Sequence, residues 1–220
     1  MKITNNFFLL AFMLVPALLI TGPALPDISI TFCALFFLFN FIVLKKDYNF
    51  FKDNFFLVSI VFWCSIILIS FFAFDKVASF QDSIIFIRLL IIPTIGYYFF
   101  FNDENKLSKT ITIIFVCVVF VTIDTLFQFF NYNSEVGFQN DILGFSSDWY
   151  GRLTGPFGDE LVPGAYLSKF GLLGYLFFLF IKKTKYLNFI EISYLSLIGL
   201  VCFATGERMA FATFFLALFF

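Results

Sequence analysis

The residues of this chain that could do chemistry gather in one polar stretch, residues 149–169, which lies between long apolar runs. Arg152 carries a guanidinium group, which binds phosphate oxygens through two parallel hydrogen bonds. Asp159 and Glu160 supply adjacent carboxylates, a group that can accept a proton from a reacting hydroxyl. The stretch therefore predicts a site for an anionic group, placed in water or in a wet cavity.

Four more polar side chains interrupt the apolar runs: Arg88, Asp124, Gln128 and Lys169. An unpaired charge in lipid costs at least about 3 kcal/mol, so these side chains must face the protein interior or a water-filled cavity. Asp124 and Gln128 are spaced i and i+4 and share one helix face. Pairing of Asp124 with Arg88 or with Lys169 would merely neutralise buried charge. Because all four lie at similar depth beneath the loop 131–160, we favour a polar cavity that opens toward this loop.

The composition identifies the frame that must hold these residues. Hydrophobic residues make up 61% of the 220 residues and charged residues only 13%, whereas soluble domains carry roughly a quarter charged residues. The apolar runs are long enough to cross a bilayer, which takes about 20 residues per helix. The chain is therefore predicted to be a polytopic helical membrane protein with the lipid bilayer as a partner. It has no basic, aromatic-interleaved surface for nucleic acid.

The residue types that usually bind metals are scarce. Histidine is absent, and each of the four cysteines lies in a different apolar run without metal-ligand spacing. We therefore expect no metal site and no other cofactor, and any mechanism must work without a histidine base.

The apolar runs predict an all-α bundle in one integral membrane domain, residues 1–220, with seven spans and a truncated eighth. The expected spans are residues 7–22, 28–44, 55–74, 83–101, 110–130, 161–181 and 187–204, with a partial helix at 209–220. The last run is too short to cross the hydrocarbon core. We therefore expect the chain to be a piece of a longer protein, cut within its eighth helix and inactive alone.

The lysines and arginines predict the orientation. With a cytoplasmic N-terminus, nine of them fall in cytoplasmic segments and three, Lys76, Arg152 and Arg208, fall outside. This asymmetry follows the positive-inside rule and places the loop 131–160 on the extracytoplasmic side. Residues 7–22 could also be a signal peptide, but the run is long for one, and we favour a retained helix kinked at Pro16.

Part of the polar stretch has a plain structural explanation. Asp159 and Glu160 come just before Pro163 at the expected start of a helix, and acids with a following proline are ordinary helix-start signals. Arg152 is not explained in this way, because the positive-inside rule disfavours arginine on this side.

Five short motifs follow one another over residues 122–211. They are Asp124-x-x-x-Gln128-x-Phe130, Leu143-Gly144-Phe145, the sequence GRLTGPFGDE at 151–160, Gly164-x-Tyr166-Leu167 and TGER at 205–208. In this order and spacing the chain resembles the O-antigen polymerase and O-antigen ligase superfamily. Family polymerases have an arginine followed after ten residues by a glycine in the third outer loop, whereas eleven residues separate Arg152 from Gly164 here.

The resemblance implies a membrane glycosyltransferase at the outer face of the bacterial inner membrane. Its substrates would be oligosaccharides carried on undecaprenyl diphosphate. A polymerase joins one repeat unit to another, and a ligase moves the chain onto lipid A-core. Chain-length regulator and flippase proteins are the protein partners that such an enzyme would have.

The resemblance also implies roles for individual residues. Arg152 and Arg208 are the leading candidates to stabilise the departing diphosphate, with Arg88 or Lys169 behind them. A proton acceptor would be Glu160, Asp159 or Asp124, or a base outside this sequence. The remaining candidates for substrate binding are Gln128, Gly155, Gly158, Gly164 and Tyr166, although the glycines form turns under any interpretation.

Two other classes of protein remain open. Intramembrane charges and glycine-broken helices also occur in secondary transporters, here for a small anion or a sugar. A non-catalytic component of a glycan export complex is the other alternative, suggested by the abrupt end of the last apolar run.

Overall fold

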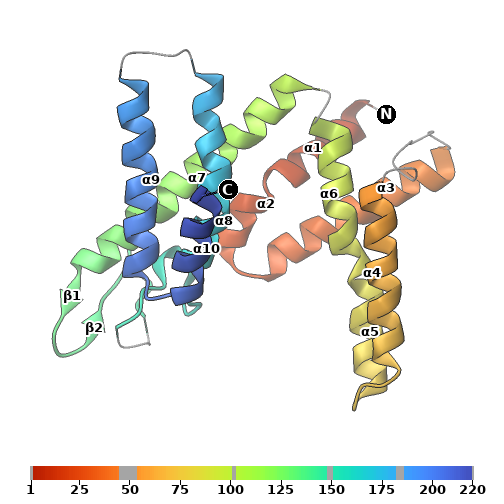
Figure 1. The fold of residues 1–220 in the computed structure, drawn as a ribbon, viewed down its shortest axis with the longest axis horizontal. Coiled ribbons are helices and arrows are strands. Elements are labelled where there is room, and N and C mark those ends of the chain that lie inside the picture. The colour runs from red at the N-terminus through yellow and green to blue at the C-terminus, as the bar shows by residue number, and fades with distance from the viewer. Residues whose placement is uncertain (1, 45–53, 101–102, 148–150, 182–185, 220) are drawn as a thin grey trace. The chain divides into compact units, whose positions relative to one another are not determined.

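The computed structural model describes residues 2–44, 54–100, 103–147, 151–181 and 186–219 (Figure 1). Helices account for 78% of the chain, which confirms the all-α class. The chain forms two compact units. One combines Met1–Val15 with Pro26–Leu107, and the other combines Pro16–Leu25 with Ser108–Phe220.

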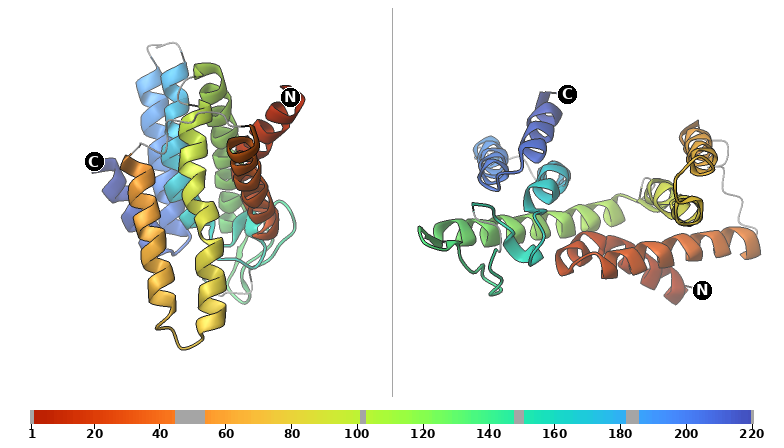
Figure 2. Two further views of the ribbon diagram at one scale, coloured as in Figure 1. Left: turned by 90° about the vertical axis from the view of Figure 1, so that its right-hand side faces the viewer. Right: turned by 90° about the horizontal axis from the view of Figure 1, so that it is seen from below.

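The described helices of the first unit are α1 (Lys2–Met13), α3 (Ala24–Leu44), α4 (Asn54–Ser70), α5 (Lys76–Ile85) and α6 (Ile87–Phe100). The core of this unit joins α1, α3 and α6 through Phe8, Phe37 and Ile95. Helices α4 and α5 lie side by side (Figure 2), and the indole N–H of Trp63 donates to the Ser83 carbonyl over 2.9 Å. The unit is thus a helical assembly without a sheet among its described residues.

The second unit carries the polar loop. Its described elements are α2 (Val15–Leu18), η1 (Leu19–Thr21), α7 (Glu104–Phe130), β1 (Tyr132–Asn133), β2 (Gly137–Phe138), η3 (Gly155–Phe157), α8 (Pro163–Tyr175), η4 (Leu176–Phe180), α9 (Leu187–Ala204) and α10 (Arg208–Phe219). β1 and β2 form an antiparallel hairpin that pairs Tyr132 with Phe138. The predicted loop 131–160 therefore begins with a short hairpin, and residues 148–150 of it lie outside the described part.

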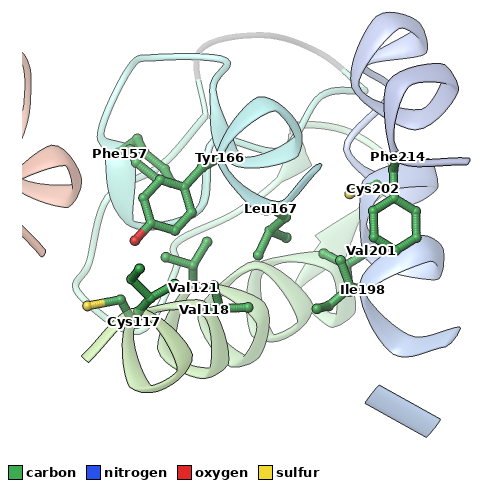
Figure 3. Packing of buried hydrophobic residues seen from close by; sticks show 11 residues of the cluster. Cys117, Val118, Val121, Phe157, Tyr166, Leu167, Ile198, Val201, Cys202 and Phe214 are labelled. Carbon is green, nitrogen blue, oxygen red and sulfur yellow. The ribbon is translucent and has the colours of Figure 1, made fainter. Parts of the chain in front are cut away.

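Helices α7, α8, α9 and α10 share one apolar core (Figure 3). Its fully buried members are Val118, Val121, Leu167, Ile198, Val201, Cys202 and Phe214. Helix α8 approaches α9 closely because Gly171 has no side chain: a Cβ at this position would lie 3.0 Å from two carbons of Ile198. The core sets the spacing of the helices whose ends carry the polar loop.

Four helical segments are long and apolar enough to cross a membrane: Lys76–Tyr97, Glu104–Phe130, Pro163–Phe180 and Leu187–Ala204. Shorter apolar helices occur at Ala24–Phe39, Asn54–Ser70 and Arg208–Phe219. The chain is thus a helical membrane protein, while seven spans, the type of membrane and the orientation stay predictions. Six of the lysines behind the predicted orientation lie outside the described residues: Lys45, Lys46, Lys52, Lys182, Lys183 and Lys185.

Several helix boundaries differ from the predicted spans: α7, for example, begins at Glu104 and not at residue 110. Two of the differences have a clear local cause. Residues 75–82, expected as a polar link, are helical from Lys76 onward, because the Asp75 carboxylate accepts a hydrogen bond from the Ala78 N–H over 3.1 Å and caps α5. The first expected span is broken after Met13. The reason is Pro16, which has no N–H to donate to the carbonyl four residues earlier.

We predict that Gly171→Ala destabilises the second unit. The new methyl group would meet both Cδ1 and Cγ2 of Ile198, and overpacking of this kind costs about 1–3 kcal/mol. The apparent Tm of the purified protein in detergent should fall. Gly96→Ala is the matched control, because its Cβ would meet only Phe12 at 3.7 Å, an ordinary contact. Equal Tm values for the two variants would contradict the close α8–α9 approach.

Candidate functional site

Gln128, a buried residue of α7, holds the polar loop against this helix through hydrogen bonds. Its buried carboxamide oxygen accepts hydrogen bonds from the N–H groups of Thr154 (3.0 Å) and Gly155 (2.9 Å). Its NH₂ group donates to the Thr154 hydroxyl over 3.1 Å. Gly155 has a φ of +51°, and a Cβ there would lie 2.6 Å from the Thr125 hydroxyl oxygen. The side chain of Gln128 and the glycine at 155 thus position the loop in this structure.

Asp124 makes a second attachment, one turn earlier on the same face of α7. Its carboxylate is fully buried, and Oδ1 accepts a hydrogen bond from the Ile142 N–H over 3.1 Å. Among the described residues of the second unit, Asp124 forms no ion pair, so the suggested pairing with Lys169 is not observed, and the pairing with Arg88, a residue of the first unit, stays a prediction. The two polar residues of the predicted Asp124–Gln128 motif therefore both bind loop backbone.

Arg88 belongs to the first unit and has its own partners there. Its Nη2 lies 2.6 Å from Asp27 Oδ1, and its Nη1 donates to the Thr31 hydroxyl over 2.6 Å. These bonds tie α6 to α3. The predicted role of Arg88 in binding the diphosphate, as a second choice after Arg152 and Arg208, is not tested by this arrangement. Its charge, however, already has a carboxylate partner in Asp27.

Glu207 caps the start of α8, although it lies more than forty residues further along the chain. Its Oε1 accepts a hydrogen bond from the Gly164 N–H over 2.8 Å, and its Oε2 accepts one from the Ala165 N–H over 3.0 Å. Helix α8 has no cap of its own, because Val162 stands at the capping position and Pro163 has no N–H. A carboxylate at a helix N-terminus also interacts favourably with the helix dipole.

Gly164 lets the TGER turn, residues 205–208, approach the helix. A Cβ at Gly164 would lie 2.6 Å from the Thr205 hydroxyl oxygen and 3.0 Å from the carboxyl carbon of Glu207. Burial raises the pKa of Glu207 above its usual value, while its two backbone hydrogen bonds and the positive charge of Arg152 act in the opposite direction. Gly164 therefore has a structural reason: its lack of a side chain permits close contact with the TGER turn.

Arg152 is exposed and lies against the same turn. A Cβ built on Gly206 would be 3.9 Å from Arg152 Cγ, and the Arg152 charge acts on Glu207. Within the described ranges the Arg152 guanidinium makes no ion pair or hydrogen bond, and the Glu207 carboxylate binds the backbone N–H groups of Gly164 and Ala165 instead. The fork of donors on Arg152 is therefore available to a ligand.

Arg208 is the next residue after Glu207 and begins α10, with its side chain exposed. The fold therefore brings together the two sequence-predicted outer arginine segments, 151–152 and 205–208, beside the start of α8. Asp159 is exposed, and Gly158 has a φ of +65° just after η3. Neither has a contact that assigns it a part in binding.

Glu160, Lys169 and Tyr166 line a cavity of about 210 Å³. Its other walls include Leu19 and Pro23, which belong to the same unit. Tyr166 is buried in the apolar core (Figure 3). Its hydroxyl donates to the Pro16 carbonyl over 2.9 Å, so Tyr166 holds α8 to α2. The cavity places a possible proton acceptor, Glu160, in the same depression as the cation Lys169.

The sequence interpretation missed Glu207 as a site residue, although it quoted the TGER motif that contains it. A signal was present: the start of the predicted sixth span, Leu161-Val162-Pro163-Gly164, offers no side chain that can cap a helix. A carboxylate from elsewhere was needed there. Asp141, which lies next to Asp124, was missed as well, because only the folded loop brings the two together.

Among the described residues there is no group of three or more cysteine, aspartate or glutamate side chains that could hold a metal ion. Comparison with protein-family models, with curated proteins and with solved structures found no match. The resemblance to the O-antigen polymerase and ligase superfamily therefore stays a prediction.

We predict a graded loss of stability in the Glu207 series. Glu207→Ala leaves two amide N–H groups without their acceptor, and losing a helix cap costs about 0.5–2 kcal/mol. Glu207→Gln keeps one acceptor oxygen and should lie between wild type and Glu207→Ala in apparent Tm. Glu135→Ala, in the exposed hairpin turn, is the control and should not change the Tm. If Glu207→Ala melts with wild type, the cap assigned to α8 is wrong.

Proposed function

We propose that this chain carries a diphosphate-binding site of a membrane glycosyltransferase that transfers oligosaccharides from undecaprenyl diphosphate, as a polymerase or a ligase. The observation that carries the proposal is the free guanidinium group of Arg152, held against the TGER turn that also carries Arg208. The motif resemblance supplies the substrate class. The outer face of a bacterial inner membrane is the location that fits this activity.

The chemistry needs a cationic site at the leaving group. In the transfer, an acceptor sugar hydroxyl attacks the anomeric carbon of the donor. The bond from that carbon to the phosphate oxygen breaks, the electron pair stays on the diphosphate, and the hydroxyl proton passes to a base. A fixed donor at such a developing charge typically contributes about 3 kcal/mol or more. Arg152 is suited to this role because its planar fork matches two phosphate oxygens.

Glu207 supports this role as a positioning residue. An acid in direct contact with Arg152 would compete with an anionic ligand. Here, however, the Glu207 oxygens are occupied by Gly164 and Ala165 at 2.8 and 3.0 Å. The carboxylate thus holds the turn near Arg152, and within the described ranges it forms no ion pair with the guanidinium. Glu160, which lines the 210 Å³ cavity with Lys169, is the candidate base that the arrangement favours.

An apolar groove on α9 and α10 suits the hydrocarbon part of such a substrate. It has a volume of about 530 Å³ and is lined by Ser196, Gly199, Phe203, Phe211, Phe215 and neighbouring aliphatic residues. Arg208, Phe211 and Phe215 are spaced i, i+3 and i+7 along α10, so Arg208 stands at the turn end of the stripe that lines the groove. A prenyl chain in the groove would thus place its diphosphate near Arg208.

The alternative of a secondary transporter has less support. A translocation path would use the intramembrane polar residues to bind substrate. Asp124 and Gln128 instead hold loop backbone at Ile142, Thr154 and Gly155.

We predict that Arg152→Ala weakens binding of undecaprenyl diphosphate at least about tenfold, because a charge-assisted hydrogen bond contributes about 1.5–3 kcal/mol. Arg152→Lys keeps the positive charge but cannot form two parallel hydrogen bonds to phosphate, so its affinity should lie between those of the wild type and Arg152→Ala. The measurement is ligand binding to the 220-residue chain in lipid nanodiscs. Lys109→Ala, which removes an exposed cation at the other end of α7, is the control. Wild-type affinity in Arg152→Ala would remove the main support for the proposed site.

We also predict that Ser196→Phe weakens binding of undecaprenyl diphosphate several-fold, because the new ring would fill the groove. Ser193→Phe makes the same exchange on the same helix, at an exposed position that does not line the groove, and should bind normally. Binding of isopentenyl diphosphate, which has no long chain, should be equal in both variants. Equal effects of the two substitutions on the long-chain ligand would show that the groove is not used.

A further inference from the structure

Two buried aspartates meet where the polar loop folds back on α7. Asp124 is 0% exposed and Asp141 is 3% exposed. Each uses one oxygen for a backbone bond of the same turn: Asp124 Oδ1 accepts from the Ile142 N–H over 3.1 Å, and Asp141 Oδ1 accepts from the Phe145 N–H over 2.7 Å. The second oxygen of each carboxyl group, Oδ2, is buried and has no hydrogen-bond partner.

The two carboxyl groups lie within interaction range of each other, and no cation among the described residues forms an ion pair with either. Asp141 directly precedes Ile142, and it is the charged residue that acts on Asp124. The ion pairs within the described ranges, Arg88–Asp27 and Lys106–Asp103, do not involve either aspartate. Two ionised carboxylates buried away from water would repel each other strongly. Each would also carry an oxygen atom without a hydrogen-bond donor.

We propose that Asp124 and Asp141 form a proton-binding site, in which the two carboxyl groups share one proton at neutral pH. One O–H group donating to the facing carboxylate would satisfy both buried Oδ2 atoms and remove one of the two like charges. The proton belongs to the pair rather than to either residue. A metal ion is a poorer fit, because hard cations take six or more oxygen ligands and no third carboxylate joins this pair among the described residues.

The shared proton acts as a latch: it allows the loop to stay bound to α7 through Asp124 and Asp141. With the proton in place, the turn 141–145 is held to α7 at Asp124. Loss of the proton leaves two facing negative charges and drives the turn away from the helix. The latch therefore holds at low pH and opens as the pH rises. Gln128 holds the same loop at Thr154 and Gly155, one turn later on α7.

The test is infrared spectroscopy of the full chain in lipid nanodiscs at pH 7. The wild-type protein should show the C=O stretch of a buried, protonated carboxyl group. This band should be absent from both Asp124→Asn and Asp141→Asn, because an asparagine NH₂ group donates to the remaining carboxylate and no shared proton is needed. Asp159→Asn removes an exposed acid and should keep the band.

A second measurement keeps the proposal testable if the asparagine variants fail to fold. In the wild type, protection of the Ile142 and Phe145 amides from hydrogen exchange, corrected for the intrinsic pH dependence, should fall over the pH range in which the band disappears. The proposal is overturned if the wild type lacks the band at pH 7, or if the band persists in both single variants. It is also overturned if the band emerges only after chelation or dialysis removes bound cations, because the pair would then hold a cation.

Discussion

The arrangement of the candidate site depends on the carboxylate of Glu207, which accepts hydrogen bonds from Gly164 and Ala165. Helix α8 begins with Val162 and Pro163, which cannot satisfy the free N–H groups at its start. The TGER turn supplies the missing acceptor and is drawn onto the helix. Because that turn lies beside Arg152, this one capping interaction positions the two segments that carry Arg152 and Arg208.

The loop that carries Arg152 is fastened at its other side by α7. Asp124 and Gln128 are expensive to bury, and both bind the loop rather than a charged partner: Gln128 through both ends of its carboxamide group, Asp124 through Oδ1. Polar residues within an apolar helix thus serve to hold the polar loop against the helical core. Arg152 thus lies on a loop, and buried hydrogen bonds from Gln128 to Thr154 and Gly155 hold that loop in place.

The helical architecture could be predicted because apolar runs of bilayer length leave few alternatives, and α7, α8 and α9 lie close to the predicted spans. The short helix α5 could not, because its start depends on the single capping contact of Asp75. For the site, sequence motifs identified Arg152, Gly164 and the TGER turn as relevant. They did not reveal that Glu207 caps α8, that Asp141 meets Asp124, or that Arg88 pairs with Asp27. Each of these contacts joins residues whose proximity arises only from tertiary packing or loop folding.

The central claim is that the turn held by Glu207 positions Arg152 for an anionic ligand. Its most direct test is a double-mutant cycle of Arg152→Ala and Glu207→Gln, read as the affinity of the chain for undecaprenyl diphosphate. Residues that act through one another show coupling energies of about 0.5–3 kcal/mol. The account predicts that Arg152→Ala costs much less affinity in the Glu207→Gln protein than in the wild type. If the two losses simply multiply, Arg152 binds independently of the turn and the account is contradicted.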